Sequence, residues 1–96
     1  MKTQIIKNPN DFRDWMVKCK DVFAFDCETN SLNYLDLEMI GFSIADGKQA
    51  CYVVLNPSNK ESMLELLDYY IQEARIVVMH NAPFDMGVLK KEGIEV

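Results

Sequence analysis

A short apolar run, Val22 to Phe25, constrains this chain more than any other stretch of its 96 residues. Its length and its polar flanks predict a buried central strand that ends near Asp26. Because side chains alternate along a strand, Asp26 and Glu28 leave it on the same side, with Cα atoms about 6.5 Å apart. Mg²⁺ and Mn²⁺ prefer oxygen ligands, so two carboxylates held in this way can share divalent cations. A pair of such ions about 4 Å apart stabilises the attacking and leaving oxygens at a phosphorus atom.

An Asp-x-Glu sequence after an apolar run is common, and by itself it usually marks a solvated strand end. A second segment of the same kind makes the metal interpretation stronger. The run Ile76 to Met79 predicts a strand buried on both faces, and the polar sequence from His80 to Asp85 follows it. If this strand lies parallel to the first, their carboxyl ends share the sheet edge at which open α/β sheets bind ligands. His80, the single histidine, is more typical of a hydrogen-bonded structural group than of a catalytic base.

Residues 81–93 predict a helix, with Asn81 as its cap, Pro83 in its first turn and Gly93 at its end. Asp85 falls in the first turn, where an acidic residue often serves only to stabilise the helix. Because Asp26 and Glu28 end a neighbouring predicted strand, we prefer a metal-ligand role for Asp85.

The other elements predict an α/β fold in which helices pack on a sheet. Asp46-Gly47 is a tight-turn signal between two strands, so a hairpin joins the Val22 strand in a three-stranded antiparallel meander. The Ile76 strand is added parallel to the Val22 strand. The remaining ranges are a short edge strand (3–6), a helix (11–18), a loop (30–38), the hairpin strands (39–46 and 50–55) and a helix with a wide apolar face (63–74).

Composition and charge exclude several classes of protein. A chain of 96 residues, 49% of them hydrophobic, is one globular domain. The net charge of -5 argues against nucleic-acid binding through a broad basic patch. The 3 cysteines form no Cys-x-x-Cys pair, which favours reduced thiols over disulfides or a zinc site. Neither a signal peptide nor a run of about 18 apolar residues is present, so we expect a cytoplasmic protein without a membrane partner.

Two motifs carry a resemblance to a known family. The segments Phe25-Asp26-Cys27-Glu28-Thr29, with Leu32, and Asn81-Ala82-Pro83-Phe84-Asp85 resemble the first two motifs of the DEDD exonucleases, which have a ribonuclease H-like fold. The order of elements, with 41–45 and 89–96, is most similar to the proofreading 3'-5' exonuclease domain of family A DNA polymerases. The resemblance implies that Asp26, Glu28 and Asp85 are catalytic, metal-binding carboxylates. It also implies substrate-binding residues: Thr29 and Leu32 at the terminal nucleotide, and Asn81 near the substrate backbone.

The same resemblance implies cofactors and partners. The cofactors are two Mg²⁺ or Mn²⁺ ions in the complete domain. The substrate is a single-stranded DNA 3' end, and RNA is not excluded. The full-length protein would also contain a polymerase region, which would give it a role in DNA replication. The family's third motif, a helix with a Tyr or His and a fourth metal-binding Asp, belongs beyond Asp85. We therefore expect residues 1–96 to be the N-terminal part of an exonuclease domain, truncated before that motif.

Two functions stay open from the sequence. The first is hydrolysis of phosphodiesters at nucleic-acid 3' ends by a two-metal mechanism. The second is a catalytically incomplete nucleic-acid-binding or interaction module of the same fold. A strand left exposed at the sheet edge also predicts self-association with another copy of the chain.

Overall fold

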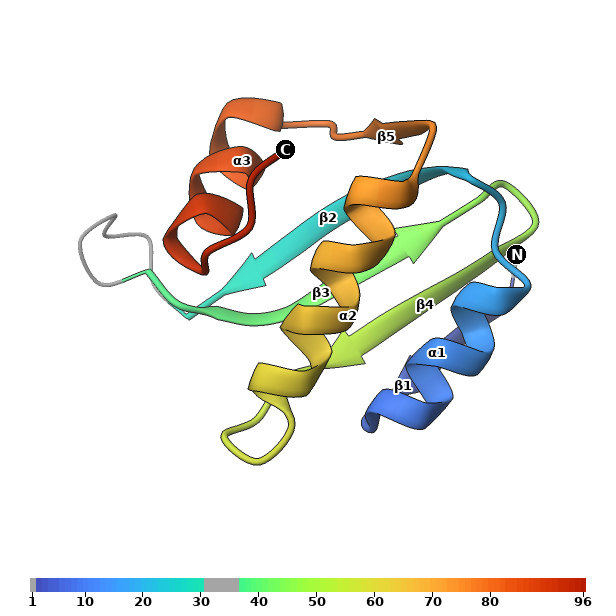
Figure 1. The fold of residues 1–96 in the computed structure, drawn as a ribbon, viewed down its shortest axis with the longest axis horizontal. Coiled ribbons are helices and arrows are strands. Elements are labelled where there is room, and N and C mark those ends of the chain that lie inside the picture. Colours follow the sequence, from blue (N-terminus) through green and yellow to red (C-terminus); the bar gives the residue numbers. More distant parts are fainter. Residues whose placement is uncertain (1, 31–36) are drawn as a thin grey trace.

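In the part of the chain that the structure describes, residues 2–30 and 37–96, five strands form one mixed sheet and three helices pack against it (Figure 1). The structure is a computed structural model. Along the chain the elements are β1 (Lys2–Ile6), α1 (Pro9–Val17), β2 (Val22–Thr29), β3 (Met39–Ala45), β4 (Gln49–Val54), α2 (Lys60–Glu73), β5 (Ile76–Val78) and α3 (Ala82–Lys91).

The strand order in the sheet is β1-β4-β3-β2-β5. β2 pairs antiparallel with β3, and β3 pairs antiparallel with β4. β5 is added parallel to β2, with Ile76 opposite Val22, and β1 pairs parallel with β4 at the other edge. These pairings confirm the predicted α/β fold, including the three-stranded meander, the added parallel strand and the short N-terminal edge strand.

The two faces of the sheet differ. Along β2, Phe23, Phe25 and Cys27 are buried, whereas the residues between them are exposed. The buried face packs against the helices, and α1 and α2 lie over it in Figure 1. Phe12 of α1, for example, makes edge-to-face ring contacts with Phe42 of β3 at 5.5 Å and with Tyr70 of α2 at 5.7 Å. The opposite face of β2 is therefore the one that carries polar side chains to the surface.

Two predictions about the strands were wrong in detail. β2 continues to Thr29 instead of ending near Asp26, because its alternation of buried and exposed side chains continues after the apolar run stops. β5 is not buried on both faces: Ile76 is 48% exposed and Val78 is 52% exposed. The reason is that β5 is the edge strand, so an unalternating apolar run here does not mark the sheet centre.

The helix ends follow the predicted signals in part. The side chain of Asn8 accepts a hydrogen bond from the backbone N–H of Asp11, so α1 begins before the predicted residue 11. Gly93, with φ of +88°, follows α3 as predicted. Asn81 precedes α3, but its side chain does not cap the helix, because its backbone lacks the extended conformation of a capping residue. No helix among residues 2–30 and 37–96 has the length and apolar character needed to cross a membrane.

An ion-pair network fixes the C-terminal end of α3. The ammonium group of Lys60, at the start of α2, lies 2.9 Å from Glu38 Oε1 and 2.9 Å from Glu92 Oε2. Glu92 Oε2 also accepts a hydrogen bond from the backbone N–H of Met39 at 3.1 Å. The network joins α3 to α2 and to the start of β3, and it thereby helps to set the position of α3 against the sheet.

Candidate active site

Asp26 and Glu28 lie on the exposed face of β2, on the same side of the strand, as the alternation predicts. The adjacent side chains of Phe25 and Cys27 point to the other side of β2 and are buried in the core, which fixes the position of the strand. The pairing of β2 with β3 shifts register between Glu28 and Thr29, which marks a bulge just beyond the second carboxylate. Both carboxylates can therefore reach a ligand on the open face of the sheet.

Asp85 occupies a different environment in the first turn of α3. It is fully buried, and its Oδ1 accepts two hydrogen bonds from Cys27, one from the backbone N–H at 3.4 Å and one from the thiol at 3.0 Å. Its Oδ2 is buried and has no hydrogen-bond partner among the described residues. A buried polar atom without a partner costs about 1–3 kcal/mol. A divalent cation is one partner that would remove this cost, so the donor chemistry of Asp85 fits a metal ligand.

The structure does not bring the three predicted carboxylates into one cluster. Asp85 contacts Cys27, the residue between Asp26 and Glu28, whereas those two side chains project from the opposite side of β2. Within residues 2–30 and 37–96, no three His, Cys, Asp or Glu side chains form a group that could hold a metal ion. Shared metal coordination by the three acids therefore stays a prediction.

A cavity of about 360 Å³ lies beside Asp26 on the open face of the sheet. The polar residues that line it are Asp26, Ser43, His80 and Asn81. Ser43 stands directly opposite Asp26 in the pairing of β2 with β3, and His80 and Asn81 come from the segment that joins β5 to α3. The cavity thus brings together two of the predicted site residues, Asp26 and Asn81.

The remaining predicted residues lie elsewhere. Thr29 is the last residue of β2 and is half-buried, and it is not among the residues that line this cavity. Leu32 lies outside the described residues. The prediction that Thr29 and Leu32 contact a terminal nucleotide is therefore untested.

Sequence reasoning missed two residues at this site, Ser43 and Cys27. The register of the predicted hairpin against β2 could have placed Ser43 beside Asp26. The alternation along β2 shows that Cys27 faces away from the two carboxylates, but its contact with Asp85 depends on how α3 packs. Burial raises the pKa of the Cys27 thiol well above its usual range, and the hydrogen bond to Asp85 raises it further. The thiol therefore keeps its proton and acts as a donor at neutral pH.

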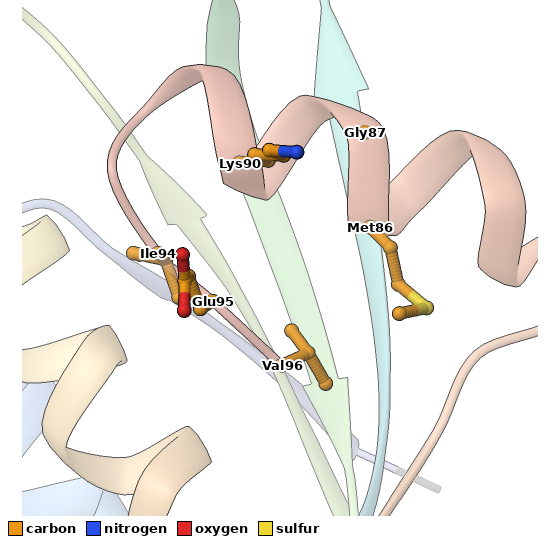
Figure 2. Close-up of a pocket in the computed structure, with 6 residues that line it drawn as sticks. All are labelled: Met86, Gly87, Lys90, Ile94, Glu95 and Val96. Carbon is orange, nitrogen blue, oxygen red and sulfur yellow. The ribbon is translucent and has the colours of Figure 1, made fainter.

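A second cavity, of about 300 Å³, lies between α3 and the segment that follows it (Figure 2). Figure 2 shows Met86 and Lys90 on the helix, and Ile94 and Val96 on the following segment. None of the predicted site residues lines this cavity. A largely apolar wall with one cation and one carboxylate does not suit metal-assisted hydrolysis, so the candidate site is the one beside Asp26.

Comparison with known proteins identifies the fold. One similar solved structure is the catalytic core of RRP6 from Trypanosoma brucei, with 17% identity and a TM-score of 0.78 over 98% of this chain and 26% of that one. A second is Escherichia coli RNase D, with 17% identity and a TM-score of 0.66 over 95% of this chain and 24% of that one. A third is Brucella melitensis NrnC, with 20% identity and a TM-score of 0.62 over 93% of this chain and 43% of that one. The chain therefore spans less than half of each of these proteins.

These likenesses show the ribonuclease H-like fold predicted from the sequence. The family model for 3'-5' exonucleases matches residues 3–96, which is nearly the whole chain. The protein belongs to the 3'-5' exonuclease family, of the DEDD type that its two motifs predict.

Proposed function

We propose that Asp26, Glu28 and Asp85 bind Mg²⁺ or Mn²⁺, and that the protein hydrolyses phosphodiester bonds at the 3' ends of single-stranded nucleic acid. The observation that carries the proposal is the buried, unpartnered Oδ2 of Asp85, beside the strand that holds the other two carboxylates. Membership of the 3'-5' exonuclease family supports the same conclusion. Brucella melitensis NrnC, a protein of similar fold, has a structure with bound Mg²⁺.

The bound metal would act as a Lewis acid at the phosphate and would lower the pKa of a bound water. The role of the protein's own elements is to position the carboxylates. β2 holds Asp26 and Glu28 on one rigid face, and α3 buries Asp85 away from solvent. Mg²⁺ readily keeps several waters when few protein oxygens bind it, so these carboxylates suit weak binding of one ion. A complete two-metal site in this family would need a further carboxylate.

We propose a single-stranded DNA 3' end as the substrate, within a DNA polymerase I-like protein whose polymerase region lies in the same chain. The sequence resemblance to proofreading domains supports this. Ser43, His80 and Asn81 line the cavity beside Asp26, and we assign them to contacts with the substrate. RNA is a second candidate substrate, because Escherichia coli RNase D is described as an exoribonuclease involved in structured RNA processing, and a structure of NrnC contains bound pGG.

A second candidate function is binding without cleavage. The separation of Asp85 from Asp26 and Glu28 favours it, since an incomplete ligand cluster would hold nucleic acid or a partner without activating water. This alternative keeps the fold and the open-face cavity but assigns no chemistry to Asp85.

One assay distinguishes these functions. The protein is incubated with 5'-labelled single-stranded DNA or RNA of one sequence, with Mn²⁺, Mg²⁺ or EDTA. We expect stepwise shortening from the 3' end that needs the metal and that falls by about 100-fold or more in Asp26→Ala, since removing one charge-stabilising group often costs that much. The matched control is Asp14→Ala, which removes an exposed acid on α1.

The outcomes separate the proposals. Metal-dependent shortening of DNA alone supports the proofreading assignment, whereas shortening of RNA alone supports the second substrate. Binding measured by fluorescence anisotropy without any shortening supports the non-catalytic module. Shortening that persists unchanged in Asp26→Ala contradicts the metal site.

A further inference from the structure

We propose that Cys27 is a positioning residue for Asp85: its thiol fixes the carboxylate through Oδ1 so that Oδ2 stays available for a divalent cation. The inference rests on the metal role proposed above. It adds Cys27 to the residues proposed for the metal site. Cys27 is buried and would affect the metal only through its contact with Asp85.

The contacts at Asp85 support this role. Both hydrogen bonds to Oδ1 come from Cys27, and the thiol bond, at 3.0 Å, is shorter than the backbone bond, at 3.4 Å. With Oδ1 held by two donors of Cys27, rotation of the carboxylate is restricted. The other oxygen is buried without a partner in the described structure, as a ligand atom would be before the ion binds.

The position of Cys27 in β2 gives the contact a further consequence. Cys27 is flanked on the strand by Asp26 and Glu28, and its side chain points to the opposite side from theirs. Its thiol therefore links the first turn of α3 to the part of β2 that carries Asp26 and Glu28. Any shift of Cys27 would change the placement of Asp85 relative to both of them. Outer groups that orient metal ligands in this way are commonly worth about 10- to 100-fold in metal affinity.

A purely structural role for Cys27 makes the opposite prediction. In that case the thiol only fills space in the core, where it is 5% exposed. Two substitutions separate the roles, because each keeps one property of the thiol. Cys27→Ser keeps a hydrogen-bond donor but places a hydroxyl in the core, and Cys27→Val keeps an apolar side chain of similar size but has no donor. Cys51→Val is the matched control, since Cys51 is a fully buried cysteine of the same sheet, on β4, which β3 separates from β2.

The experiment measures Mn²⁺ affinity of the 96-residue protein by isothermal titration calorimetry, with the melting temperature of each variant recorded in EDTA. We expect Cys27→Val to weaken Mn²⁺ binding by about 10-fold. Cys27→Ser should stay within a few-fold of the parent protein although it melts at a lower temperature. Cys51→Val should bind Mn²⁺ as the parent does.

Three results contradict the proposals, and each contradicts a different part. If Cys27→Val binds Mn²⁺ as tightly as the parent, or if Cys51→Val is weakened equally, Cys27 does not position Asp85. If Mn²⁺ affinity follows melting temperature across all the variants, the role is packing alone. If the parent protein and Asp85→Asn both fail to bind Mn²⁺, the metal site itself is wrong.

Discussion

Asp46 shows how a single carboxylate can organise a turn of this sheet. Its Oδ1 accepts hydrogen bonds from the backbone N–H groups of Lys48 and Gln49, both at 3.0 Å, and its Oδ2 accepts one from Lys20 at 3.2 Å. Burial works against ionisation of Asp46, but these N–H donors outweigh it and lower its pKa to about 2. The side chain thus links the hairpin between β3 and β4 to the segment that leads into β2.

The lowered pKa sets a pH dependence of stability. Because the pKa in the folded state is below the ordinary value of 3.8, ionised Asp46 stabilises the fold above about pH 4, and this stabilisation is lost as the pH falls towards 2. We expect Asp46→Ala to lower the free energy of unfolding at pH 7 by about 1 kcal/mol, a usual cost for a lost capping side chain. Urea unfolding at pH 7, 4, 3 and 2 measures the difference, which should shrink towards pH 2.

Asp46→Asn serves as the control, because an amide oxygen still accepts hydrogen bonds but does not titrate in this range. Its free energy of unfolding should differ from that of Asp46→Ala by a constant amount between pH 4 and pH 2. A parent protein and an alanine variant whose stabilities fall in parallel from pH 7 to pH 2 would show that Asp46 does not carry this pH dependence.

The single-residue features of the site were only partly predictable. Placing Asp26 and Glu28 on one face needs nothing but the two-residue period of a strand, so the sequence suffices. The contact between Cys27 and Asp85 joins residues 58 positions apart, and it depends on the packing of α3 against β2. No local pattern specifies that packing, and the role of Cys27 was therefore missed.

At the scale of elements, α3 depends on contacts at both of its ends. Its first turn meets β2 through Asp85, and the Glu92 carboxylate just beyond its last turn bridges Lys60 and the backbone N–H of Met39. We expect Glu92→Ala to cost about 1–3 kcal/mol, because it leaves the Met39 N–H without its acceptor and Lys60 with Glu38 alone. Amide hydrogen exchange should accelerate in α3 more than in β3 or β4.

Glu95→Ala provides the matched control, since Glu95 is exposed and follows the same helix. It should leave both the stability and the exchange rates close to those of the parent protein. If exchange in α3 is as slow in Glu92→Ala as in the parent, the ion-pair network does not hold the helix in place.

The elements also show where sequence patterns stop being informative. The turn at Asp46-Gly47, the succession of strands and helices along the chain and the helix predicted over residues 81–93, which the structure has as Ala82–Lys91, follow from local signals. The exposure of β5 does not follow from such signals. An apolar run such as Ile76 to Val78 has the same composition at the centre of a sheet as at its edge, and only the arrangement of the whole chain decides which it is.

At the scale of the whole molecule, the sheet ends in two unlike edges. β1 begins with Lys2 and is followed by Lys7, and charged residues on an edge discourage pairing with other chains. β5 consists of three β-branched apolar residues, with Ile76 and Val78 about half exposed. Of the two edges in the described structure, β5 is therefore the better template for a second copy.

We expect the protein to associate through β5 at high concentration. The net charge of -5 on each copy opposes association, so added salt should strengthen it. Sedimentation velocity over a range of protein and salt concentrations measures the effect. Val78→Lys should remain monomeric, because a charge within the new strand pair would have to be desolvated. Ile5→Lys, which changes a residue 57% exposed on β1, should associate as the parent does. Only monomer at every concentration, or equal loss of association in both variants, would exclude β5 as the interface.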